Sequence, residues 1–112
     1  MASVTAAIVQ MDAQADPQDN RRRAEALVGL AADRGADLVV LPEVFVFFGQ
    51  MKQMRSHAEP IPGPTTDMLQ ETARRHGIYL VGGSFFSTIE GSEKVYNSNL
   101  VLGPDGEIIA HY

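Results

Sequence analysis

The stretch "DLVVLPEVFVFFG", residues 37–49, places a carboxylate between two apolar runs. The first run, residues 38–41, contains only Leu and Val and shows no alternation, which is typical of a strand covered on both faces. Pro42 ends this strand, and Glu43 follows directly. Because apolar residues continue beyond it, we expect Glu43 at a wall of the core, where an ionised carboxylate is costly unless it is paired or used.

The segment before this strand predicts the first part of an α/β domain. Ser3 to Met11 is short, apolar and partly β-branched, as in a buried strand. Asp16 and Pro17 are typical of a helix start, and apolar residues then recur at helical spacing until Gly35. A strand, a helix and a strand joined by short connections imply a right-handed crossover and a parallel pair.

The second half of the chain changes from helices to short strands. A second helix is expected from Thr65 through Arg75, with N-caps offered by residues 65–67, and a third buried strand from Ile78 to Val81. Glycine-containing turns then separate apolar segments, as in hairpin-connected antiparallel strands. These strands are expected at 84–89, 95–102 and 107–112.

The expected fold is therefore α/β, a mixed sheet with both helices on one face. The other face then needs a partner, which is a second sheet, another chain or further residues.

The composition fits one soluble globular unit, because 45% of the 112 residues are hydrophobic and 21% are charged. A net charge of −5 gives no basic surface for nucleic acid. Apolar runs stay well short of the roughly 20 residues of a membrane helix, and the start lacks a signal-peptide pattern, so cytoplasm is the expected location. The absence of cysteine excludes a disulfide, a thiolate metal site or a cysteine nucleophile within these residues.

Several other side chains are candidates for chemistry, and the sequence argues against each of them. Ser84 has no spaced His and Asp partners of the triad type, so a serine nucleophile is not expected. No metal site is expected, because the histidines lack ligand spacing. They are His57, His76 and His111.

Two further motifs favour structural roles. Gly82-Gly83 lacks a phosphate-loop pattern, and close approach of another backbone segment explains it better. Asn97 and Asn99 are unusual inside a strand, and we expect buried hydrogen-bonding roles for them.

Glu43 is the leading candidate for chemistry. It follows the carboxyl end of the second strand, where open α/β sheets place their ligand crevice, and a carboxylate there suits a general base. A structural role, as a loop carboxylate paired with an Arg or a backbone amide, is the alternative that the residues alone leave open.

Four stretches, taken together and in order, resemble the amino-terminal half of the nitrilase superfamily of carbon–nitrogen hydrolases, in particular its amidase and omega-amidase-like branches. They cover nearly the whole chain. They are "AAIVQMDAQADPQDN", "GADLVVLPEVF", "AEPIPGPTTDMLQETARRHGIYLVGGSF" and "VYNSNLVLGPDGEIIAHY".

The resemblance implies half of a four-layer α-β-β-α sandwich and one member of a Glu-Lys-Cys active site. The Glu that closes the family's "LPE" motif matches Glu43. Tyr112 matches a Tyr that lies two residues before the family's Lys, so that the Lys and the Cys would lie beyond this chain. Neither Lys52 nor Lys94 matches that Lys. Residues 1–112 are then expected to be the amino-terminal part of one truncated hydrolase domain.

The resemblance also implies a function. The complete protein would cleave the C–N bond of a small-molecule amide, or less readily attack a nitrile, without a cofactor and as a homo-oligomer. This chain alone would be inactive. Two alternatives are a non-catalytic α/β module that associates with a partner chain, and a generic ligand-binding domain.

Overall fold

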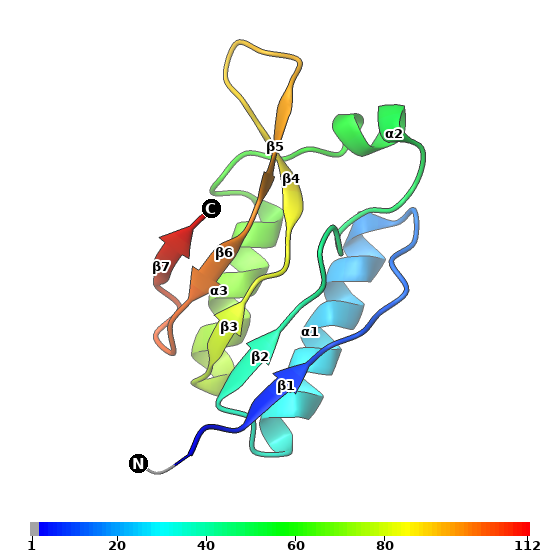
Figure 1. Ribbon diagram of the computed structural model, residues 1–112. Coiled ribbons are helices and arrows are strands. Elements are labelled where there is room, and N and C mark those ends of the chain that lie inside the picture. Colours follow the sequence, from blue (N-terminus) through cyan, green and yellow to red (C-terminus); the bar gives the residue numbers. More distant parts are fainter. Residues whose placement is uncertain (1–2) are drawn as a thin grey trace.

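Five strands of residues 3–112, the part of the chain that the computed structural model describes, pair into one sheet in the order β1-β2-β3-β6-β7 (Figure 1). The first three are parallel, and β6 and β7 are antiparallel additions, so the predicted mixed sheet is confirmed. The strands are β1 Ala6–Ile8, β2 Leu38–Val40, β3 Tyr79–Val81, β6 Leu100–Leu102 and β7 Ile108–His111.

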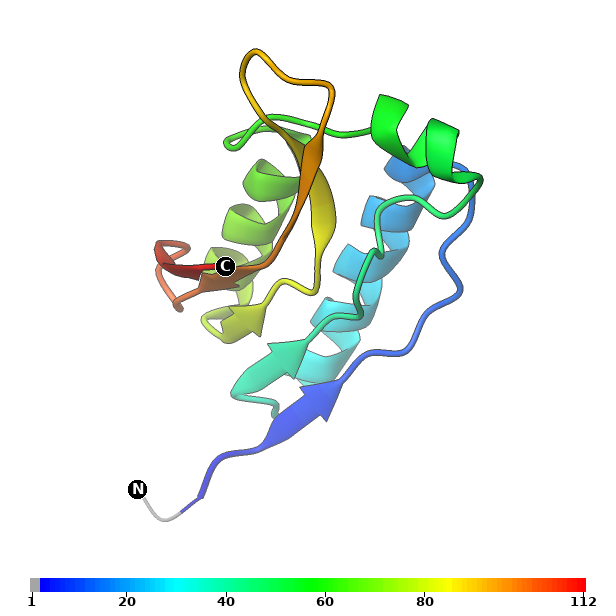
Figure 2. The ribbon, with the colours of Figure 1, turned by 45° about the horizontal axis from the view of Figure 1, so that its top comes forward.

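Two longer helices, α1 (Pro17–Asp33) and α3 (Pro64–His76), cover the same face of this sheet, as predicted (Figures 1 and 2). The side chain of Asp16 caps α1 by accepting the N–H of Asp19 at 3.2 Å. A short helix, α2 (Met51–Ser56), lies in the long connection after β2. The expected N-caps at residues 65–67 are wrong, because α3 begins at Pro64 with Gly63 at the N-cap position.

A separate antiparallel ribbon is formed by β4 (Phe85–Thr88) and β5 (Val95–Ser98). The single strand expected over 95–102 is therefore wrong, since the chain changes sheets at Asn99. There the Asn99 side chain donates to the carbonyl of Gly83, and its backbone exchanges two hydrogen bonds with Tyr112. These bonds fix the point at which the chain leaves the ribbon and enters the main sheet as β6, beside β3.

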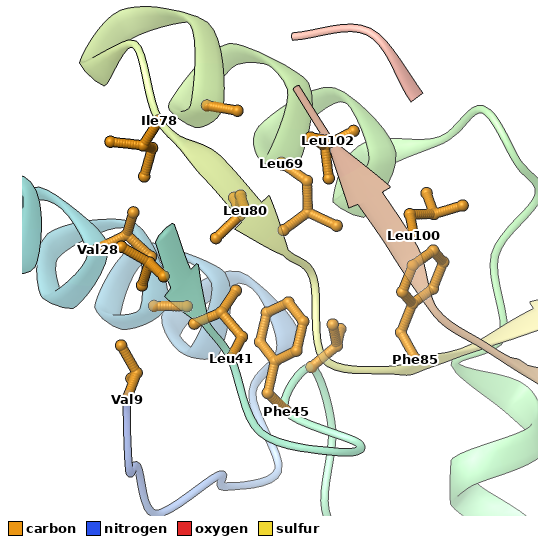
Figure 3. Packing of buried hydrophobic residues seen from close by; sticks show 14 of the residues in the cluster. Val9, Val28, Leu41, Phe45, Leu69, Ile78, Leu80, Phe85, Leu100 and Leu102 are labelled. Atoms are coloured by element: carbon orange, nitrogen blue, oxygen red, sulfur yellow. The ribbon is translucent and has the colours of Figure 1, made fainter. Parts of the chain in front are cut away.

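The core lies between the sheet and the two helices. Val39, Leu80 and Leu102 are fully buried on the covered face of neighbouring strands. Leu69 of α3 packs among them, and Phe45, from the connection after β2, enters the same cluster (Figure 3). The connection that carries Glu43 is thereby anchored in the core two residues further on.

The opposite face of the sheet carries an apolar row. Strand register places five side chains side by side across all five strands, and alternation along each strand turns them away from the helices. Ile8, at one end of the row, is 84% exposed. The apolar row consists of Ile8, Val40, Val81, Val101 and Ala110. Within residues 3–112, no helix is long and apolar enough to cross a membrane.

Candidate active site

The candidate site lies where β2 and β3 end at the same edge of the sheet. Pro42 and Glu43 follow β2, and Gly83 and Ser84 follow β3. Because the two strands are parallel, these short segments leave the sheet side by side. Val44 then reverses the backbone with a φ of 51°, in the left-handed region that β-branched residues rarely adopt.

Ser84 holds this backbone reversal in place. Its Oγ accepts the N–H of Val44 at 2.8 Å, and its carbonyl accepts the N–H of Phe45 at 3.2 Å. Its own N–H donates to the carbonyl of Pro42 at 3.3 Å. A strained residue of this kind costs about 1–3 kcal/mol and persists only where its surroundings fix it. The three bonds and the fully buried Phe45 ring supply that support.

Gly82 and Gly83 allow the close contacts that the sequence predicts for them. A Cβ atom on Gly82 would lie 2.8 Å from the carbonyl oxygen of Leu100. Gly83 has a φ of 59°, and a Cβ there would overlap with the carbonyl of Pro42. The structural interpretation of the glycine pair is therefore confirmed.

The side chain of Glu43 is exposed in this structure, and the expected position at a wall of the core is wrong. Phe45 and Phe47 turn into the protein, whereas the reversal at Val44 leaves Glu43 on the outside. Its Oε1 accepts a hydrogen bond from Nδ2 of Asn97 at 2.9 Å. Glu43 thus has an amide partner, and it comes from a side chain 54 residues further along the chain.

The asparagines differ from expectation in burial and agree with it in hydrogen bonding. Asn97 is exposed and Asn99 is half-buried, so the expectation of buried roles is wrong. Each nevertheless donates its side-chain amide to the candidate site: Asn97 to Glu43, and Asn99 to the carbonyl of Gly83.

Glu43 lies between two open hollows. One, of about 310 Å³, is bordered by Asn97, Asn99 and Tyr112 and reaches the apolar row at Val40 and Val81. The other, of about 430 Å³, is bordered by Met11, Asp12, Phe48 and Met54. A small molecule in either hollow would therefore lie beside Glu43.

Glu59 is a second carboxylate, which the sequence analysis missed, and it is only 8% exposed. Its Oε1 accepts the N–H of Thr65 at 2.6 Å, and its Oε2 accepts the Thr65 hydroxyl at 2.8 Å. Arg21 of α1 approaches Oε2 at 3.7 Å. Glu59 therefore caps α3 in place of the missing side chain at Gly63, which makes its role structural. The sequence does contain a signal for this role. Pro64 is typical of the first position of a helix, Gly63 before it has no side chain to cap the helix, and the carboxylate of Glu59 lies a few residues earlier.

The remaining candidates do not gather around Glu43. His57 stacks on Phe47 with ring centroids 4.1 Å apart, whereas His76 lies at the end of α3 and His111 in β7. Within residues 3–112, no group of three or more His, Cys, Asp or Glu side chains could hold a metal ion. Neither Lys52 nor Lys94 borders either of the two hollows described beside Glu43.

Fold and site together define a class: an α/β domain with a candidate acid–base carboxylate at the carboxyl edge of its sheet. The carbon-nitrogen hydrolase family model matches residues 5–112. The chain belongs to this family, which places it in the nitrilase superfamily, and the α/β fold class expected from the resemblance is confirmed.

Curated relatives are omega-amidases. The chain is 43% identical over 109 residues to omega-amidase NIT2 of Danio rerio, covering 97% of this chain and 39% of the relative. It is 39% identical over 112 residues to omega-amidase NIT2 of Homo sapiens, covering 100% of this chain and 40% of the relative. The chain thus spans about two fifths of the length of these relatives.

Solved structures of the superfamily share the fold. Nit3 of Saccharomyces cerevisiae, a member of branch 10 of the nitrilase superfamily, matches with a TM-score of 0.86 and 28% identity, over 97% of this chain and 43% of that one. A glutamate-to-glutamine mutant of the amidase from Nesterenkonia sp. AN1, with acrylamide added at the active-site cysteine, matches with a TM-score of 0.83 and 27% identity. That match covers 98% of this chain and 43% of the amidase.

Proposed function

We propose that residues 1–112 are the amino-terminal part of an amidase-type hydrolase of small-molecule amides, and that Glu43 is its general base. The observation that carries this proposal is the Glu43 carboxylate, fixed at the carboxyl edge of the sheet and open to two hollows. The omega-amidase relatives, which are up to 43% identical among those described above, support an amide over a nitrile as substrate.

Amide hydrolysis needs more than a base. The amide carbon is a poor electrophile, so an activated nucleophile must attack it, and the oxyanion that forms must be stabilised. In the superfamily that this chain resembles, a Cys and a Lys take these two roles. We propose that both come from the part of the protein outside residues 1–112, in keeping with relatives of which this chain spans about two fifths.

In this mechanism Glu43 transfers protons. It takes the proton of the thiol, so that the S–H bond breaks, an O–H bond forms and the thiolate attacks the carbonyl carbon. The C–N bond then breaks, ammonia leaves with that proton, and an acyl thioester remains. Glu43 next takes a proton from water, whose oxygen attacks the thioester and releases the acid and the thiol. The net reaction converts the amide and water into the acid and ammonia, and it regenerates the thiol and the Glu43 carboxylate.

A second candidate function has one observation in its favour. The apolar row is exposed at both ends and half-buried in between, and a non-catalytic module that binds a partner chain would use such a surface. The two candidate functions can be told apart in the complete protein, because only a hydrolase would release ammonia from an amide.

The test compares the complete protein with residues 1–112 alone, both purified from a host that lacks its own amidases. We expect ammonia release from small aliphatic amides by the complete protein only. Ammonia release by residues 1–112 alone would contradict the proposed division of the active site. A complete protein inactive on every amide and nitrile offered, yet folded and bound to a partner chain, would support the non-catalytic module.

A further inference from the structure

The two oxygens of the Glu43 carboxylate have different surroundings. Oε1 accepts the Asn97 amide at 2.9 Å. Among residues 3–112, no hydrogen bond reaches Oε2. A carboxylate with one oxygen bound and the other open can exchange a proton through the open oxygen while the bound one fixes its orientation.

Asn97 lies in the middle of β5, and its neighbours along and across the ribbon are well ordered by pairing. In the ribbon it pairs with Phe86, whose carbonyl accepts the N–H of Glu59 at 3.1 Å. The next residue, Ser98, is 2% exposed, and its hydroxyl lies 2.7 Å from that of Ser87. Asn97 is exposed, but it lies in a ribbon that is paired along its length and next to the buried Ser98, so its amide is presented to Glu43 from an ordered strand.

We propose that Asn97 is a positioning residue that holds Glu43 through Oε1 and leaves Oε2 as the oxygen that takes and returns the proton. This inference rests on the proposed role of Glu43 as the general base. An amide suits this task because its N–H donates to the carboxylate without adding a charge beside the base. Lys or Arg at this position would add a positive charge beside the base and lower its proton affinity.

The test measures kcat, KM and the thermal melt of the complete protein with Asn97→Ala and Asn97→Asp. We expect Asn97→Ala to lower kcat by about 10-fold to 100-fold, the range typical of a misplaced reactive group, with little change in KM or Tm. Asn97→Asp keeps the shape but puts a second carboxylate beside Glu43. Since two such groups cannot both ionise easily, the acid limb of the kcat/KM profile should move to higher pH.

Gln70→Ala is the matched control. It removes another side-chain amide, which donates to the carbonyl of Gly106 at 2.9 Å on the helix side of the sheet. We expect unchanged kcat and an unchanged pH profile from this variant.

The double variant Glu43→Gln/Asn97→Ala separates this inference from the proposed function. We expect it to be no slower than Glu43→Gln alone, because Asn97 acts through the base. Normal activity of Glu43→Gln would overturn the proposed function and this inference with it. A slow Glu43→Gln together with a normal Asn97→Ala would overturn the inference alone. The inference would also be overturned by a second combination of results. In that case Asn97→Ala lowers both kcat and Tm, and the kcat/KM profile of Asn97→Asp is not shifted in pH.

Discussion

Gly83 and Pro42 are packed so closely that a Cβ atom on Gly83 would overlap with the carbonyl of Pro42. This contact joins the segments that leave β2 and β3, one of which carries Glu43 and the other Ser84. The candidate base is therefore placed by a contact between two backbones, which only glycine permits at this point.

Gly83→Ala should destabilise the complete protein by more than the penalty of placing a side chain at a positive φ. Gly91→Ala is the control, because Gly91 also has a positive φ, 75°, and no atom of the described chain lies within 4 Å of its added Cβ. The backbone penalty alone is about 1–2 kcal/mol. We expect Gly83→Ala to cost about 1–3 kcal/mol more because of the overlap with Pro42. Urea unfolding of both variants measures this, and equal destabilisation would contradict the account.

Glu59→Ala should lower stability with little direct effect on chemistry. Removing this carboxylate leaves the buried N–H and hydroxyl of Thr65 without their acceptor, at a cost of about 2–4 kcal/mol. Glu93→Ala, at an exposed position in the hairpin between β4 and β5, should stay within about 0.5 kcal/mol of wild type. Thermal melts of the two variants give the comparison. A Glu59→Ala variant as stable as Glu93→Ala would show that Glu59 does not cap α3.

The ion pair between Asp19 and Arg22 should give α1 a pH-dependent contribution to stability. The hydrogen bond from Arg22, opposed by some desolvation and aided by Arg23, holds the pKa of Asp19 below its ordinary value of 3.8. Since the folded state lowers this pKa, the contribution is complete above 3.8 and is lost as the pH falls through the lowered value.

Asp19→Asn should therefore have a lower Tm than wild type near neutral pH, and the difference should vanish in acid. Arg22→Gln should show the same pattern, and added salt should reduce both differences because the pair is at the surface. A Tm difference that stayed constant down to strongly acidic pH would contradict this assignment.

The apolar row should make residues 1–112 associate when they are produced alone. Sedimentation velocity should show oligomers or aggregates, and Val81→Asp should shift the distribution towards monomer because it puts a charge in the middle of the row. Val4→Asp is the control, since Val4 is 57% exposed but lies outside the row. A compact wild-type monomer with a sharp cooperative melt would contradict the need for a partner at this face.

The sequence was sufficient for the arrangement of the main sheet because long apolar runs and helix caps are local signals. Asp16-Pro17 marks the start of α1 by itself, and Leu38 to Leu41 reads as a buried parallel strand without reference to any other segment. The same reasoning placed Glu43 at the carboxyl edge of the sheet.

Features that depend on distant contacts were predicted poorly. The exposure of Glu43 follows from the positive φ of Val44, a value that a β-branched residue does not favour. This backbone conformation is held by Ser84, which lies 40 residues further along the chain. The change of sheet at Asn99 depends on contacts with Gly83 and Tyr112, and no residue pattern within 95–102 predicts it. Hydrophobic periodicity likewise cannot reveal the bond between Asn97 and Glu43, because it joins the connection after β2 to the separate β4-β5 ribbon.

Glu43→Gln in the complete protein tests the central claim most directly. The change keeps the volume of the side chain, and its amide oxygen can still accept from Asn97, so Tm should stay within the error of the melt. It removes the base, so the steady-state rate of ammonia release from an amide should fall by at least about 10²-fold, the low end of general-base contributions. Glu93→Gln should leave that rate unchanged. A Glu43→Gln protein that releases ammonia at nearly the wild-type rate would contradict the assignment of Glu43 as the general base.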